Sequence, residues 1–426
     1  MKTLILGEDL VAWTLAAALS STGCRVYMQA GRLPDMASEA VEPDVLVLLE
    51  QQLEAGRLSL QAFFWQAAEE GVELLLDARD FVGLDTLLRD IKASGLPALV
   101  ALVQPAPLGT TEALQEELHA LPEASTEVVF WPNFIQAGRA LESFTRIEQL
   151  LLGSNSEDAT LKIKRLMLPF NRSQDRFKVV TPREAELTKL AINGMLATRV
   201  SFMNELAQLA ASHGVDIEAV RQAMGADTRI GYQYLYPGCG FGGEAFLQTL
   251  EQLNRELNST RPVTDRTASL LGEVQAINDQ QKDLLFQKLW RYYRAEVQGR
   301  RVALWGCAFK PNTASVSGSP ALHLIRVLLE HQVQVVVYDP RAAVNLAGYF
   351  DHPEGLEIAE SPEEAAQGSD AVLVVTEWKE FWNLDLPALR DQMKEPLLLD
   401  GRNIYDPDEM AAAGWIYSGV GRGKVI

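Results

Sequence analysis

Short apolar runs alternate with helical stretches over the first third of the chain. Residues 2–6 (KTLIL) predict a buried strand, Gly7 a turn, and the apolar run through Leu19 a helix. Further strand-like runs follow at 26–28, 73–76, 96–103 and 127–130. This alternation predicts a parallel sheet with helices on both faces.

A long helical segment then interrupts the alternation. Thr181-Pro182-Arg183-Glu184 is a capping box with proline at the first helical position. Apolar residues recur at helical spacing until Gly214, which predicts the end of the helix. A helix of about 32 residues would be roughly 48 Å long, so it would span two domains or join two subunits. More helix is predicted to about Tyr293.

The strand–helix alternation returns after residue 300. Strands are predicted at 302–305, 333–338, 371–376 and 397–400, with a helix at 320–331. The pattern therefore predicts two α/β domains of similar plan, joined by a helical middle. We expect the domains to cover residues 1–180, 181–295 and 296–426.

Composition and charge exclude several classes of protein. Of the 426 residues, 47% are hydrophobic and 22% are charged, as in ordinary globular proteins. The net charge of −19 argues against nucleic acid or an anionic membrane as a partner. With no apolar run long enough to cross a bilayer, we expect a cytoplasmic protein. The three cysteines form no CxxC pair and the five histidines are scattered, so no metal site is predicted.

Four segments carry a family resemblance. They are TPREAELTKLAINGMLATRVSFMNELAQLA (181–210), PGCGFGG (237–243), GCAFKPNT (306–313) and DGRNIYDP (400–407), with TEW (376–378) and GRG (421–423) in addition. In this order and spacing they resemble the UDP-glucose/GDP-mannose dehydrogenase family. The match covers most of the chain from Thr181 onward and is thinner before it. The resemblance implies two Rossmann-like, doubly wound parallel-sheet domains joined by a long central helix and a helical dimerisation domain.

The catalytic positions of the family are replaced in this chain. Family members oxidise a sugar C6 alcohol to a carboxylate with two NAD molecules, using a cysteine, a lysine and an aspartate in a G-G-S-C-F-x-K-D motif. Those three positions are Ala245, Gln248 and Thr249 here. Two glutamates and a threonine of the family fall at Asn133, Ala137 and Pro105. Since alanine forms no covalent adduct and no general base remains, the resemblance implies that no catalytic residue is intact.

The dinucleotide fingerprint is altered as well. In G-x-G-x-x-G the glycines let the backbone approach the pyrophosphate. Only Gly7 is kept, because Asp9 and Ala12 replace the other two glycines, and Ala30 stands where an acidic residue would hold the ribose. A carboxylate at about 4 Å from a phosphate would cost roughly 4 kcal/mol at an effective dielectric of about 20. We therefore expect NAD to bind weakly or not at all, and expect no cofactor.

The nucleotide-sugar positions are largely kept. Lys189 and Asn193 lie four residues apart on the predicted helix and share a face. By resemblance, Arg229 reaches the neighbouring subunit's substrate, and Phe309, Lys310 and Arg402 contact the uracil, ribose and diphosphate. The full set of expected substrate-binding residues is Phe134, Lys189, Asn193, Arg229, Gly240, Gly242, Phe309, Lys310 and Arg402.

These positions predict a UDP-glucose 6-dehydrogenase-like pseudoenzyme. It would be a homodimer that binds a UDP-sugar such as UDP-glucose, linked to sugar-polymer synthesis or its regulation, and it could pair with an active paralogue. One alternative is an active nucleotide-sugar dehydrogenase with altered or partial NAD-dependent oxidation. The other is an interaction scaffold in which both pockets are vestigial.

Overall fold

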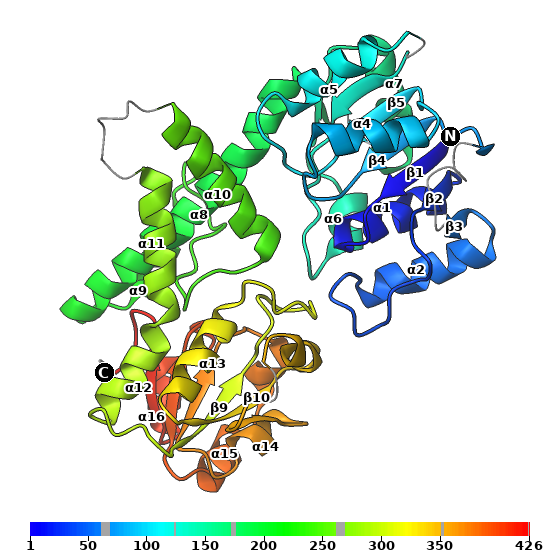
Figure 1. The fold of residues 1–426 in the computed structure, drawn as a ribbon. Coiled ribbons are helices and arrows are strands. Elements are labelled where there is room, and N and C mark those ends of the chain that lie inside the picture. Colours follow the sequence, from blue (N-terminus) through cyan, green and yellow to red (C-terminus); the bar gives the residue numbers. More distant parts are fainter. Residues whose placement is uncertain (61–68, 123–124, 172–175, 261–268, 351–352, 425) are drawn as a thin grey trace. The chain divides into compact units, whose positions relative to one another are not determined.

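The computed structural model describes residues 1–60, 69–122, 125–171, 176–260, 269–350, 353–424 and 426. It divides into two compact units, Met1–Ile192 and Asn193–Ile426 (Figure 1). The division falls within the long helix α8 (Pro182–His213). The three-domain division at residues 180 and 295 stays a prediction.

The first unit contains an eight-stranded sheet in the order β3-β2-β1-β4-β5-β6-β7-β8. Its strands are β1 (Lys2–Leu6), β2 (Arg25–Met28), β3 (Leu58–Leu60), β4 (Leu74–Asp77), β5 (Leu99–Leu102), β6 (Glu127–Phe130), β7 (Leu150–Gly153) and β8 (Phe177–Val180). The first six strands pair in parallel in the doubly wound order 3-2-1-4-5-6, which confirms the predicted fold class, although β3 was not among the predicted strands.

The first sheet departs from parallel pairing at one junction, which the sequence did not predict. β6 and β7 pair antiparallel, with Phe130 opposite Gly153. β7 and β8 were not predicted from the sequence. The predicted strand at 96–103 also began too early, because Gly95 (φ 86°) and Leu96 (φ 52°) adopt left-handed backbone and form a turn before Leu99.

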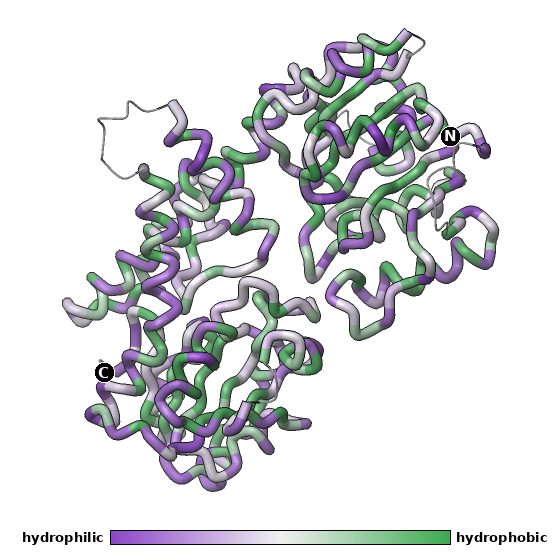
Figure 2. The backbone as a smooth tube through the Cα atoms, in the orientation of Figure 1, coloured by the Kyte–Doolittle hydropathy of each residue, from purple (hydrophilic) through white to green (hydrophobic). Residues whose placement is uncertain are grey.

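The helices of the first unit pack on this sheet. They are α1 (Leu10–Ser21), α2 (Pro43–Glu54), α4 (Leu84–Ala93), α5 (Thr110–His119), α6 (Ala140–Thr145) and α7 (Glu157–Met167), followed by the 3-10 turn η1 (Leu168–Phe170). Nine consecutive residues of α1, Ala12–Ser20, are buried, so this helix lies inside the unit's hydrophobic core. Figure 2 shows the same concentration of hydrophobic residues along β1 and α1.

Helix α8 begins and ends where the sequence predicted. The Thr181 backbone N–H donates to Glu184 Oε2 at 2.9 Å, and the Glu184 N–H donates back to Thr181 Oγ1 at 3.4 Å. The helix ends before Gly214, whose φ of 66° suits glycine. Buried Glu186 accepts hydrogen bonds from the Gly109 N–H (2.6 Å) and the Thr111 N–H (3.0 Å), so it satisfies the first turn of α5.

The second unit joins helices to a six-stranded parallel sheet. The helices after α8 are α9 (Ile217–Ala226), α10 (Glu244–Ser259), α11 (Leu270–Lys282) and α12 (Leu284–Tyr292). The strands are β9 (Arg301–Trp305), β10 (Gln334–Tyr338), β11 (Leu356–Ile358), β12 (Ala371–Val374), β13 (Leu397–Asp400) and β14 (Ile416–Gly419), in the order β11-β10-β9-β12-β13-β14. This order repeats the doubly wound plan of the first unit, which confirms the prediction of two similar α/β folds.

Short helices cover the second sheet. They are α13 (Pro320–Glu330), α14 (Pro362–Ala366), α15 (Leu386–Gln392) and α16 (Pro407–Ala412), with 3-10 turns η2 (Ala343–Gly348) and η3 (Lys379–Asn383). The strands β9, β10, β12 and β13 form the centre of the largest hydrophobic cluster. Among the described helices, none combines the length and apolar character needed to span a bilayer.

Candidate functional site

The turn after β1 is built as a nucleotide-binding turn would be. Gly7 has a φ of 125°, and a Cβ there would lie 3.2 Å from the Ala12 Cβ and 3.3 Å from the Ala78 carbonyl carbon. Only glycine therefore fits at position 7. Ala12 is fully buried and packs closely against this turn, so its replacement of glycine preserves the contact between strand and helix.

Asp9 fills the anion-binding position at the start of α1. It is the N-cap of that helix, and its Oδ1 accepts a hydrogen bond from the Ala12 N–H at 2.9 Å. Its Oδ2 accepts a second one from Gln104 Nε2 at 2.9 Å. Although the residue as a whole is exposed, the desolvated position of its carboxylate and the nearby Asp80 raise the pKa of Asp9 to about 6. The chain's own carboxylate thus occupies the helix terminus to which a pyrophosphate would bind in a dinucleotide site.

Ala30 and Arg79, in the turns after β2 and β4, offer no contact that would replace those of the fingerprint. Ala30, which follows β2, is buried and has no side-chain acceptor for a ribose hydroxyl. Arg79, in the turn after β4, is held by its own neighbours. It donates from Nε to Asp77 Oδ1 at 3.0 Å and from NH1 to Asp90 Oδ2 at 2.8 Å.

Lys189 lies in a closed environment in the first unit. Its side chain donates to the Asn133 carbonyl at 2.7 Å and lies over the Phe134 ring, 4.8 Å from its centroid. Because the residue is only 9% exposed, burial lowers the pKa of Lys189 to about 8. The structure thus brings together three of the predicted positions, Lys189, Asn133 and Phe134.

Gln104 joins this group to Asp9, and sequence reasoning missed it. Asn133 Nδ2 donates to Gln104 Oε1 at 3.0 Å, and Gln104 Nε2 donates to Asp9. Three polar side chains from the ends of β1, β5 and β6 therefore form one continuous chain of hydrogen bonds. The sequence could have identified Gln104, because it directly follows the buried run 99–103. Side chains at the carboxyl ends of parallel strands meet at one edge of the sheet.

The positions of the family's catalytic groups carry no acid, base or nucleophile. Pro105 and Ala137 have no ionisable group. Ala245 is exposed in the first turn of α10. Gln248 Nε2 donates to Glu244 Oε1 at 3.2 Å, and Thr249 Oγ1 donates to the Ala245 carbonyl at 2.7 Å. Gln248 and Thr249 each form their hydrogen bond within their own helix.

Cys239 does not substitute for the lost nucleophile. It is 2% exposed, and a Cβ on Gly401 would lie 2.8 Å from its sulfur. Burial raises the pKa of the Cys239 thiol, which disfavours the reactive thiolate.

The expected nucleotide-binding groups of the second unit border its glycine-rich loop, residues 237–243. A Cβ on Gly243 would lie 3.0 Å from the Phe309 ring, and a Cβ on Gly238 would lie 2.9 Å from Arg402 NH1. The Arg402 Nε donates to the Val375 carbonyl at 2.6 Å and lies 3.3 Å from Glu377 Oε2. Lys310 Nζ lies 5.6 Å from the Phe309 ring centroid.

The other predicted substrate residues of the second unit differ in exposure. Asn193 is half-buried on α8, four residues after Lys189. Arg229 is exposed, with 85% of its side chain accessible, and pairs with Asp227 at 2.6 Å. Gly242 is confined by packing, since a Cβ there would lie 2.3 Å from the Gly318 carbonyl oxygen.

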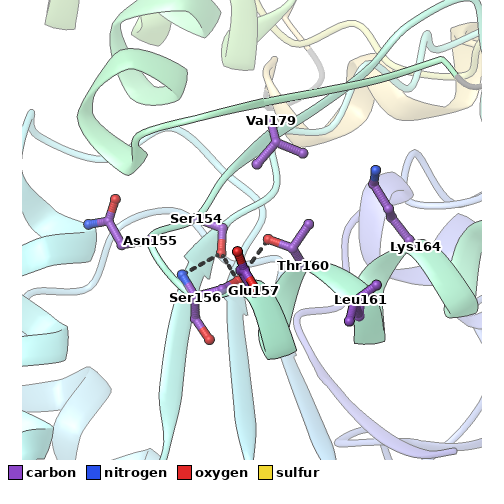
Figure 3. A pocket seen from close by; sticks show the side chains of 8 residues that line it. All are labelled: Ser154, Asn155, Ser156, Glu157, Thr160, Leu161, Lys164 and Val179. Carbon is purple, nitrogen blue, oxygen red and sulfur yellow. Dashed lines mark hydrogen bonds between the residues drawn. The ribbon is translucent and has the colours of Figure 1, made fainter.

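A cavity of about 330 Å³ lies elsewhere in the first unit (Figure 3). It is lined by Ser154, Asn155, Ser156, Glu157, Thr160, Leu161, Lys164 and Val179. Ser154 Oγ and Thr160 Oγ1 both donate to the Ser156 carbonyl, at 2.9 and 2.8 Å. None of the predicted site residues lines it. No cluster of His, Cys, Asp and Glu able to hold a metal ion occurs among the residues that the structure describes.

Comparison with known proteins places these sites in a family. Residues 183–280 match the central domain of the UDP-glucose/GDP-mannose dehydrogenase family, and residues 303–407 match its UDP binding domain. A UDP-glucose 6-dehydrogenase of Pseudomonas aeruginosa is 34% identical over 455 residues, covering 99% of this chain and 98% of that protein.

Solved structures agree in fold. A UDP-glucose dehydrogenase from the hyperthermophilic archaeon Pyrobaculum islandicum superposes with a TM-score of 0.83 at 27% identity, over 99% of this chain and 97% of that one. A UDP-D-ManNAc dehydrogenase from Pyrococcus horikoshii has a TM-score of 0.80 at 22% identity, with full coverage of both chains. The chain therefore belongs to the UDP-glucose/GDP-mannose dehydrogenase family.

Proposed function

We propose that this chain binds a UDP-sugar, such as UDP-glucose, without oxidising it. The observation that carries the proposal is the position of Asp9. Its carboxylate accepts hydrogen bonds from the Ala12 N–H and from Gln104, at the helix terminus where a dinucleotide's pyrophosphate would need those donors. Without NAD there is no acceptor for the sugar's hydride.

The catalytic positions support the same proposal. Ala245 cannot hold a thiohemiacetal, and Gln248 and Thr249 are engaged with their own helix neighbours. The relatives named UDP-glucose 6-dehydrogenase, at 34% and 29% identity, support a substrate of the same class.

A UDP-sugar is favoured by the second unit. The match to a UDP binding domain covers Phe309, Lys310 and Arg402. Cationic side chains there would offset a diphosphate's charge in a protein whose net charge is −19. By resemblance, Lys189, Asn193 and Phe134 would hold the nucleotide sugar, and Arg229 would reach the pocket of a second subunit. Gly240 and Gly242 would let the backbone approach the ligand closely.

We also propose a homodimer assembled through α8. Three large apolar side chains of this helix are exposed at seven-residue spacing: Met195 (62%), Phe202 (50%) and Leu209 (56%). A stripe of this period is buried most simply against its symmetry mate. A role in sugar-polymer synthesis or its regulation, a cytoplasmic location and pairing with an active paralogue complete the proposal.

Calorimetric titration of the purified protein with UDP-glucose and, separately, with NAD tests this function. Binding of UDP-glucose without binding of NAD supports it. Binding of both, with NADH appearing in the mixture, would support an active enzyme with altered oxidation instead. If neither ligand binds, the chain is an interaction scaffold and the proposal fails.

A further inference from the structure

The backbone N–H groups of the glycine-rich loop (237–243) divide into two sets. Four of them donate within the protein: Gly238 to Asn204 Oδ1 (2.9 Å), Cys239 to the Gly401 carbonyl (2.9 Å), Phe241 to Asn278 Oδ1 (2.8 Å) and Gly243 to the Ser317 carbonyl (3.3 Å). The N–H groups of Gly240 and Gly242 have no hydrogen-bond acceptor among the described residues. Pro237 has none to donate.

Two buried asparagines produce this division. Asn278 on α11 is 2% exposed and takes both polar groups of Phe241, accepting its N–H and donating Nδ2 to its carbonyl at 3.1 Å. Asn204 on α8 is fully buried and fixes Gly238 from the helix side. Its Nδ2 has no partner among the described residues, an arrangement that costs stability. A role in stability alone therefore does not explain why Asn204 is there.

Unpaired donors gather on this loop. Gly240 is buried, and a buried N–H without an acceptor is rare unless a ligand or water supplies one. The two terminal nitrogens of Arg402 likewise have no hydrogen-bond acceptor among the described residues, although the guanidinium packs against Gly238. Backbone N–H groups beside a guanidinium form a site for a phosphate.

We infer that Asn204 and Asn278 are positioning residues that hold the loop so that the N–H groups of Gly240 and Gly242 are left for the phosphates of the bound nucleotide. Neither asparagine touches the ligand in this arrangement. Each acts through the backbone that it fixes. The inference rests on the proposed binding of a UDP-sugar and assigns how that site recognises the diphosphate.

The test compares UDP with uridine, which lacks the phosphates. Asn278→Leu keeps a similar volume but removes both hydrogen bonds to Phe241. We expect it to weaken UDP binding at least about tenfold, while uridine binding changes less than about twofold. Asn204→Leu should act in the same direction, and it serves as the second variant if Asn278→Leu does not fold.

Gln281→Leu is the matched control. Gln281 is another buried amide on α11, 1% exposed, whose Nε2 has no hydrogen-bond partner and which makes no hydrogen bond to the loop among the described residues. This variant should keep the UDP affinity of the unchanged protein, whatever its melting temperature. Equal UDP affinities for Asn278→Leu and Gln281→Leu would overturn the inference, as would parallel losses for UDP and uridine. Failure of the unchanged protein to bind UDP would instead overturn the proposed function, and the inference with it.

Discussion

Asp9→Asn should change how the stability of the first unit depends on pH. The unfolded carboxyl ionises near 3.8, whereas in the folded chain its pKa is raised to about 6. Between these values the folded state binds more protons, so stability falls as pH rises from about 4 to about 6, and the full cost is present above pH 6. Asparagine cannot ionise and escapes this cost.

The magnitude follows from the same values. A pKa difference between 3.8 and about 6 corresponds to about 3 kcal/mol for a fully buried carboxylate. Because Asp9 is partly open to solvent, screening reduces this to about 1 kcal/mol. For a unit of this size that is a shift of about 2–4 °C in melting temperature. The hydrogen bond from Gln104 favours the ionised carboxylate, and its effect is already contained in the net pKa of Asp9.

Scanning calorimetry at pH 4 and pH 7 measures how the melting-temperature difference between the variant and the unchanged protein changes with pH. The melting temperature of Asp9→Asn minus that of the unchanged protein should rise by about 2–4 °C between the two pH values. Asp44→Asn is a suitable control, because Asp44 is an exposed acid in the first turn of α2. If the difference in melting temperature between Asp9→Asn and the unchanged protein is the same at both pH values, the pKa of Asp9 is not raised by folding. The carboxylate at the start of α1 would then cost no electrostatic free energy.

Four further outcomes are expected. Fluorescence titration of the unchanged protein should give no micromolar affinity for NADH. Ala245→Cys alone should yield no UDP-glucuronate from UDP-glucose by chromatography, since the other catalytic positions remain replaced. Arg402→Ala and Lys310→Ala should each reduce UDP-glucose affinity at least about tenfold in calorimetry, while Glu244→Ser should change it little. Light scattering should give a dimeric mass at micromolar concentration, and Phe202→Glu should lower it to the monomer, because charge on the exposed stripe opposes its burial.

Local signals in the sequence were enough for most of the fold. The capping box at Thr181 and the glycine at 214 predicted α8 within one residue at each end, because side-chain caps determine where a helix starts and stops. Five strands were missed: β3, β7, β8, β11 and β14. Strand β8 has exposed residues and little apolar alternation, and its pairing with β7 depends on contacts remote in sequence.

The site was predictable in its residue types but not in its contacts. The sequence identified Asp9 as an obstacle to a dinucleotide, yet it did not show that the carboxylate caps α1 or that Gln104 binds it. Asn204 and Asn278 were also missed, since a polar residue within a helix shows its importance only when the loop that it holds is placed beside it.

Two replaced positions of the first unit, Asp9 and Asn133, are joined by hydrogen bonds through Gln104. Asp9, Gln104 and Asn133 are linked by hydrogen bonds of 2.9 and 3.0 Å, so this edge of the sheet carries a continuous polar network. Restoring any one position would leave another without its partner: Asp9→Gly would deprive Gln104 Nε2 of its acceptor, at a cost of about 1–3 kcal/mol if that amide stays buried. Under the proposed function, this coupling opposes any single substitution that would open a dinucleotide site. The expected nucleotide-binding side chains of the second unit take part in none of these hydrogen bonds, so they can be retained for binding independently.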